Sequence, residues 1–167
     1  MTSIIKVDQI QLADGSTPNA QDLGLAAGSV IQVVTSTYAT ETSSGASSYT
    51  DTGLSASITP SNTSNKILVL CNLCSAGVQQ TGGNDANGKF KLVRGGTDLY
   101  ESIHRSYDYG GSGQITFGSY LMSWLDSPST TSSTTYKLQQ QLAAGTSIRI
   151  CESNNTCLLY TSPSPRD

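Results

Sequence analysis

The fold of this chain is decided by residues 54–74, LSASITPSNTSNKILVLCNLC. Apolar and polar residues alternate from Leu54 to Ile58, which is the pattern of a strand with one buried face. Residues 59–65 are rich in Pro, Ser, Asn and Thr, which favour turns. A nearly continuous apolar run from Lys66 to Cys74 then predicts a central strand. Two strands joined by a turn therefore set an antiparallel β pattern.

Similar patterns recur on both sides of this pair. About eight strands are predicted, at 30–38, 49–58, 66–74, 89–94, 98–101, 114–125, 134–142 and 147–151. The segment Arg94-Gly95-Gly96-Thr97 predicts a two-residue hairpin, because glycine adopts the positive φ angles of such turns. Residues 102–113 are predicted to form an irregular aromatic loop, and Trp124 a core position. No helical periodicity is sustained, so an all-β antiparallel sandwich is expected.

The composition narrows the class of protein. The chain contains 26 serines and 20 threonines, whereas charged residues make up only 13%. Its net charge is −3 with no block of like charge, so neither nucleic acid nor an anionic membrane is an expected partner. No apolar run approaches the ~20 residues of a membrane span, and the N-terminus lacks the features of a secretory signal. This make-up is typical of exposed extracellular or virion surfaces.

The chain divides into three parts. Residues 1–28 carry interleaved apolar residues (Ile4, Ile5, Val7, Ile10 and Leu12) and a turn cluster at 13–18. They predict a short strand, a turn and one helical turn, too small to fold alone, so they are expected to pack on the main body or on a partner chain. Residues 29–153 are the predicted sandwich domain, and residues 154–167 are set apart as a tail.

The four cysteines do not predict a metal site. Cys71 and Cys74 have the C-x-x-C spacing of metal and redox sites, but they lie in a predicted strand. Residues three apart on a strand point to opposite faces, so the two thiols could share a metal only across a sharp turn. Cys151 and Cys157 supply no second C-x-x-C. Reduced, structural cysteines are expected, with a zinc or redox site as the alternative, and no cofactor is predicted.

The aromatic loop is the best candidate for binding. Tyr100, Tyr107 and Tyr109 offer flat faces, and His104, Arg105 and Asp108 offer polar groups beside them. The hypothesis is contact with a host glycan or receptor. The alternative is that the tyrosines cover the sheet ends or lie in a subunit interface.

Catalysis is not expected. His104 is the single histidine, and no G-x-S-x-G nucleophile elbow is present. Glu101 and Asp108 are the default candidates for the paired acids of a glycoside hydrolase. The run at 84–88, NDANG, lacks the later Glu of a calcium loop and is explained by turn chemistry.

Three segments together resemble a family of tailed-phage virion proteins from marine and other environmental viruses, described as tail-fibre or structural proteins. They are 57–69, SITPSNTSNKILV; 91–97, KLVRGGT; and 125–139, LDSPSTTSSTTYKLQ. The starts of the chains are also similar, at Ile5-Lys6-Val7-Asp8 and Ala13-Asp14-Gly15-Ser16. The resemblance covers residues 3–153. It implies a jelly-roll-like sandwich that is homotrimeric and located on the virion surface.

The end of the chain departs from that family, whose members finish with an apolar strand after the Asn-rich turn. Residues 157–167, CLLYTSPSPRD, resemble a translated sequencing-adapter read. Residues from about 157 onward are therefore predicted to be non-native, with a disordered tail as the alternative. On this interpretation the last strand of the sheet is missing.

The sequence therefore predicts a non-enzymatic virion structural protein. Its leading interpretation is a tail-fibre or appendage head that presents loops to host glycans or receptors, assembled in the host cytoplasm. Residues 1–28 would attach it to other virion proteins or thread the oligomer. The alternatives are a capsid decoration or architectural protein with no receptor role and, less favoured, a fragment of a polysaccharide depolymerase.

Overall fold

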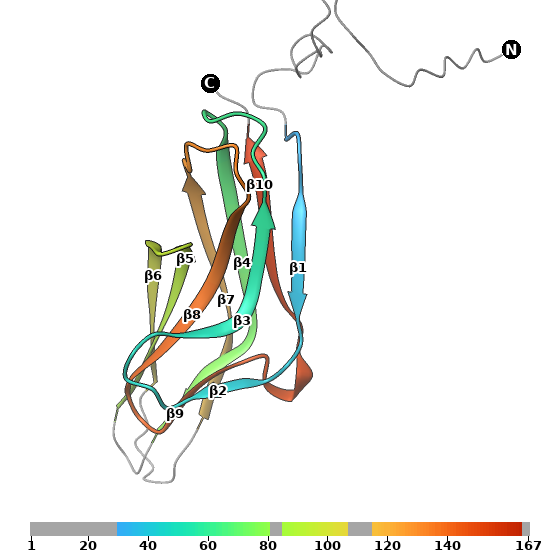
Figure 1. Cartoon of the computed structure of the whole chain (residues 1–167). Helices are drawn as coiled ribbons and strands as arrows, with labels where there is room; N and C mark the ends of the chain where they lie inside the picture. The colour runs from blue at the N-terminus through green and yellow to red at the C-terminus, as the bar shows by residue number, and fades with distance from the viewer. Residues whose placement is uncertain (1–29, 81–84, 107–114, 165–167) are drawn as a thin grey trace, which may run out of the picture.

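The structure, a computed structural model, describes residues 30–80, 85–106 and 115–164 (Figure 1). These residues form ten strands and one short 3₁₀ helix. The elements are β1 Val34–Tyr38, β2 Thr42–Ser44, β3 Thr50–Ile58, β4 Lys66–Gln79, β5 Ala86–Arg94, β6 Thr97–Ser106, β7 Ile115–Asp126, β8 Thr134–Ala144, β9 Ser147–Ile150, η1 Glu152–Asn154 and β10 Cys157–Ser164. No helix within these ranges is long and apolar enough to cross a membrane.

The strands form two antiparallel sheets stacked face to face, with β1 and β6 on opposite sides of the molecule (Figure 1). Sheet A has the order β1-β10-β4-β7. The short strand β9 pairs with β4 at residues 77–79, past the end of the β10 pairing at residues 66–72, and β2 pairs with β9. Sheet B has the order β3-β8-β5-β6. Sheet A thus has six strands and sheet B four, and the eight longer strands, four in each sheet, have the order of a jelly roll. The predicted all-β antiparallel sandwich is therefore confirmed.

The core lies between the sheets and follows the period-two pattern of the sequence. Leu54, Ala56 and Ile58 of β3 are buried, as their alternation predicts. Phe90 and Tyr136 are the largest fully buried side chains. Fully burying an aliphatic or Phe side chain contributes roughly 1.5–3 kcal/mol each, so this alternation is the main source of stability. The inward residues of β4 are Ile67, Val69, Cys71 and Leu73.

A buried polar cluster closes one end of the core. Arg94 donates from Nη1 to both carboxylate oxygens of Asp126, at 2.9 and 2.8 Å. Tyr136 donates to Asp126 Oδ2 at 2.7 Å. Burial and the adjacent carboxylate raise the pKa of Tyr136, so its hydroxyl stays protonated as the donor. The cluster joins β5, β7 and β8.

The predicted hairpin at 94–97 is confirmed. Arg94 pairs with Thr97, and Gly95 adopts a φ of 56°, which glycine tolerates without steric cost. The register then shifts between Leu92 and Val93, where a β-bulge adds one residue to β6. This bulge decides which β6 side chains face outward near Arg105.

Several predicted boundaries are wrong. The first strand begins at Val34, not at 30, and the interval between the predicted strands at 30–38 and 49–58 contains β2. The interval between the predicted strands at 66–74 and 89–94 is narrower than predicted, because β4 continues to Gln79 and β5 begins at Ala86. These strands extend into polar sequence because the neighbouring strands satisfy the backbone N–H and C=O groups of the polar residues, and this pairing does not depend on the type of side chain.

Residues 157–164 occupy a strand position, although the sequence analysis sets them apart as a non-native or disordered tail. β10 pairs with β1 on one side and β4 on the other. Cys157, Leu159 and Thr161 are fully buried, whereas Leu158 is exposed, so the segment has the alternation of a half-buried strand. Sheet A therefore has its last strand in place, and the foreign origin of these residues stays a prediction.

The cysteines differ from expectation in one respect. Cys151 and Cys157 form a disulfide, with Cα atoms 6.1 Å apart, so the prediction of reduced cysteines is wrong for this pair. The short turn through η1 brings the two residues together. Cys71 and Cys74 are free and lie on opposite faces of β4, as predicted.

Candidate functional site

Strand β6 separates the residues that the sequence analysis grouped in one loop. The prediction of a loop from residue 102 is wrong as far as Ser106, because β6 continues to that residue. Tyr100 and His104 face inward toward β7, whereas Arg105 lies on the outer face of sheet B. Tyr107, Asp108 and Tyr109 lie outside the described residues.

The inward residues close the side of the sandwich between the edge strands β6 and β7. The rings of Tyr100 and Trp124 stack with their centroids 6.2 Å apart. Tyr120 hydrogen-bonds the ring of His104, and their ring centroids lie 4.8 Å apart. Burial lowers the pKa of His104 and raises that of Tyr120, so both groups are neutral at pH 7. Tyr100 and His104 therefore have structural contacts here.

Trp124 is not a core residue, contrary to the prediction. Its side chain is 39% exposed. The reason is that β7 pairs only with β4, so one flank of Trp124 opens to solvent at the edge of sheet A. A strand pattern reports which face a residue is on, but it does not report how near the sheet edge the residue lies.

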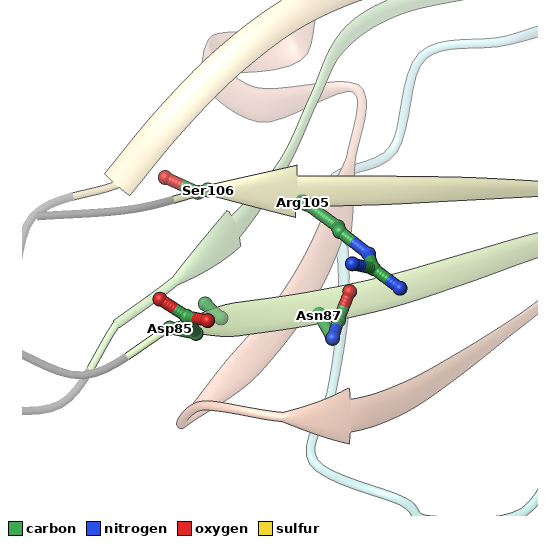
Figure 2. Close-up of a pocket in the computed structure, with 5 residues that line it drawn as sticks. Asp85, Asn87, Arg105 and Ser106 are labelled. Atoms are coloured by element: carbon green, nitrogen blue, oxygen red, sulfur yellow. The ribbon is translucent and has the colours of Figure 1, made fainter.

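Arg105 belongs to a polar pocket at the end of the β5–β6 ladder. The pocket has a volume of about 150 Å³ and is lined by Asp85, Ala86, Asn87, Arg105 and Ser106. Asn87 is the cross-strand partner of Arg105, and Figure 2 shows the guanidinium of Arg105 beside the Asn87 side chain. Asp85 and Ser106 lie farther along the same two chain segments (Figure 2). Among the described residues, no ion pair involves Arg105 or Asp85.

Hydrogen bonds fix the inner wall of this pocket and leave acceptors available. Ser106 Oγ accepts from Gln80 Nε2 at 2.8 Å and is 2.6 Å from Thr116 Oγ1. Asn87 Oδ1 and Gln80 Oε1 are buried and have no hydrogen-bond partner in the described part of the chain. An unpaired buried acceptor costs about 1–3 kcal/mol, so a donor reaching Asn87 would be favoured. The pocket thus combines a cation, a carboxylate, an amide and a hydroxyl.

Elsewhere on the outer face of sheet B the charges are paired. Lys89 lies 3.2 Å from Glu101, Lys91 2.9 Å from Asp98 and Lys137 2.8 Å from Asp51. These pairs neutralise the face around the pocket.

Glu101 also accepts a hydrogen bond from Tyr49, which is the main reason that its pKa is lowered. This carboxylate, considered above as a hydrolytic acid, is therefore held ionised by its neighbours. Asp108, its hypothetical partner, lies outside the described residues.

No metal site is formed by the residues that the structure describes, since no three His, Cys, Asp or Glu side chains gather there. Burial raises the pKa of Cys71 to about 12, which makes it a poor thiolate ligand. The turn predicted at 84–88 is wrong for Ala86–Gly88, which begin β5, and Asp85 lines the pocket. Asn84 lies outside the described residues.

Arg105 is a predicted binding residue, whereas its neighbours in the pocket, Asp85, Asn87 and Ser106, are not predicted. The available signal was the hairpin at Gly95-Gly96, which brings the 85–88 region beside the 103–106 region. The bulge then changes the pairing by one residue, so that Asn87 pairs with Arg105 and not with His104.

Comparisons with known proteins add little to this geometry. No protein-family model and no curated protein matches the sequence. Among solved structures, the chain is similar to that described as "Crystal structure of infectious bursal disease virus VP2 subviral particle", with a TM-score of 0.38 and 12% identity. The match covers 81% of this chain and 40% of that chain, so this chain spans less than half of the matched one. The jelly-roll assignment therefore stands on the strand order itself.

Proposed function

We propose that this chain is the head of a virion fibre or appendage and attaches to host-surface glycans through the pocket around Arg105. The observation that carries the proposal is the pocket's chemistry. Arg105 offers several donors, while Asp85 and the unpaired oxygen of Asn87 offer acceptors, within a cavity of about 150 Å³. Sugars present hydroxyls that donate and accept together, and acidic sugars add a carboxylate suited to a guanidinium.

Three further features support this function. The Ser/Thr-rich, weakly charged composition suits an exposed surface, and a jelly roll is a common architecture of capsid and lectin domains. The resemblance of residues 3–153 to phage virion proteins points the same way. Weak single-site binding would suffice for attachment, because a homotrimer would raise the effective concentration of its sites.

The test is binding of the full chain to an array of neutral and acidic glycans and to intact host cells. Arg105→Ala and Asn87→Ala are expected to lower binding at least about ten-fold, as expected for losing hydrogen bonds to a charged group. Lys137→Ala is the matched control, since Lys137 is a cation on the same sheet that pairs with Asp51 away from the pocket. Binding that survives both pocket variants would refute the site.

Tyr107→Ala and Tyr109→Ala test on the same array whether these two tyrosines also contact the glycan. Glycan binding that is unchanged by these two substitutions restricts the site to the pocket. Complete absence of glycan and cell binding would favour the alternative function, a capsid decoration or architectural role without a receptor.

A further inference from the structure

Strand β10 lies between β1 and β4 and links them into one sheet. It pairs with Val34–Tyr38 of β1 on one side and with Lys66–Asn72 of β4 on the other. Among the described residues, β1 pairs with no strand except β10, so the ladder hydrogen bonds of β1 depend on the segment that lies beside it. We call the position between these two ranges the strand site.

The first half of β10 fits the strand site well. Leu159 is fully buried between Ser36 of β1 and Cys71 of β4. Cys157 is also fully buried, and its disulfide with Cys151 ties this end of β10 to the preceding chain. The first half therefore contributes buried side chains to the core and is covalently held.

The second half of β10 fits the strand site poorly. Thr161 is fully buried opposite Val34 and Val69, and its hydroxyl has no hydrogen-bond partner in the described part of the chain. The hydroxyl of Ser162, a residue that is 2% exposed, is unpaired there as well. Pro163 follows, and proline is rare inside paired strands. Buried polar groups without partners are destabilising, whereas apolar groups of the same shape are not, so the strand site favours a different sequence.

We infer that the strand site binds an extended peptide segment of another protein in place of residues 158–164. Peptide strands that join a sheet gain affinity from main-chain hydrogen bonds and specificity from the pockets for alternate side chains. Here the inward pockets are those that hold Leu159 and Thr161. Their neighbours on β1 and β4 are uncharged, so the segment needs apolar side chains at both positions. Valine has the shape of threonine, so the segment that fits has a leucine at the first position and a valine at the second.

Replacement of β10 can begin at its C-terminal end. The pairing with β1 ends at Thr161, so residues 162–164 pair with β4 alone. Segments with few partners open locally at a lower free energy than the rest of a fold. The disulfide fixes Cys157 at the opposite end and does not hold residues 158–164. An incoming segment therefore pairs first with Lys66–Leu68 and then takes the place of Thr161.

The experiment measures the binding of two fluorescent peptides to the full chain by anisotropy. One peptide has the sequence of residues 158–164, LLYTSPS, and the other carries Thr161→Val and Ser162→Ala. The substituted peptide is expected to bind at least about ten-fold more tightly, because it buries no unpaired hydroxyl. Its binding to the Thr161→Val chain is expected to be about five-fold weaker, since the chain's own β10 then competes better. Ser57→Ala, at an exposed position on β3, is the control chain and is expected to bind as the wild type does.

Hydrogen exchange locates the bound peptide. The substituted peptide is expected to speed exchange of the β10 amides at 158–162 and to leave those of β1 and β4 protected. Three results overturn the inference: equal affinities of the two peptides, unchanged exchange in β10 when the peptide is bound, and no binding up to the solubility limit of the peptide. No glycan enters this measurement, so its result is independent of glycan binding at the pocket around Arg105.

Discussion

At the residue scale, the hydroxyl of Tyr136 stabilises the buried polar cluster that it forms with Arg94 and Asp126. Asp126 is 6% exposed and accepts from both Arg94 and Tyr136. A buried carboxylate needs such donors, because an uncompensated charge in the core is strongly destabilising. The guanidinium supplies the charge, and the Tyr136 hydroxyl fills a remaining acceptor position.

Tyr136→Phe is expected to lower the free energy of unfolding by about 2 kcal/mol, since it removes a hydrogen bond to a charged group and leaves the ring in place. Urea denaturation measures the change. Ser57→Ala is the control, because the Ser57 hydroxyl bonds Thr135 on the exposed surface and its loss is expected to cost less than about 0.5 kcal/mol. Equal effects of the two substitutions would contradict the role of the cluster.

His104 gives the fold a pH dependence. Burial lowers its pKa in the folded state, so the unfolded chain binds a proton more readily below the ordinary histidine pKa of about 6.5. The free energy of unfolding is therefore unaffected by His104 above that pH, where the ring is neutral in both states, and it decreases as the pH falls below it. The urea midpoint is expected to drop between pH 8 and pH 5, and to drop less in His104→Gln. An identical drop in both proteins would show that other groups cause it.

At the scale of the elements, the sequence predicts strands better than their edges and registers. Alternation located β3, the apolar run at 66–74 located the first part of β4, and the glycine pair located the β5–β6 hairpin. The bulge at Leu92 could not be predicted, because it depends on how β5 fits β6 and β8 together. The grouping of His104 with Arg105 failed because residues 102–106 belong to β6, and neighbouring residues on a strand point to opposite faces.

The last strand is not predicted, for a different reason. The resemblance of residues 157–167 to a translated sequencing-adapter read sets them apart from the domain, with a disordered tail as the alternative. In the structure, the space between β1 and β4 orders them through ladder hydrogen bonds with both neighbours. Pro163 cannot donate to that ladder, and the buried hydroxyl of Thr161 has no partner in the described part of the chain. β10 is therefore a poorly satisfied strand in a central position.

Two buried threonines test this view of β10. Thr161→Val is expected to stabilise the protein by about 1 kcal/mol, because it removes an unpaired buried hydroxyl without changing the shape of the side chain. Thr52→Val is expected to destabilise it by a similar amount, because the Thr52 hydroxyl donates to the Leu138 carbonyl at 3.0 Å and accepts from Leu54 N–H. Urea unfolding midpoints measure the two changes in stability. Destabilisation by both substitutions would contradict the view that β10 is poorly satisfied.

For the molecule as a whole, the two outer faces differ in chemistry. Sheet B carries paired charges and the pocket around Arg105, whereas sheet A presents exposed leucines on β7 and β10 and the ion-paired Arg149 on β9. A ligand held by the unpaired charge of Arg105 should therefore respond to ionic strength.

Salt is expected to weaken the binding of acidic glycans to the pocket around Arg105. Raising the ionic strength from 0.1 M to 1 M shortens the Debye length from about 10 Å to about 3 Å, which weakens contacts between exposed charges. The dissociation constant of an acidic glycan is therefore expected to rise at 1 M salt, whereas that of a neutral glycan is expected to stay the same, because only the acidic sugar presents a carboxylate to the guanidinium. An acidic glycan that binds equally well at both salt concentrations would mean that the charge of Arg105 does not hold it.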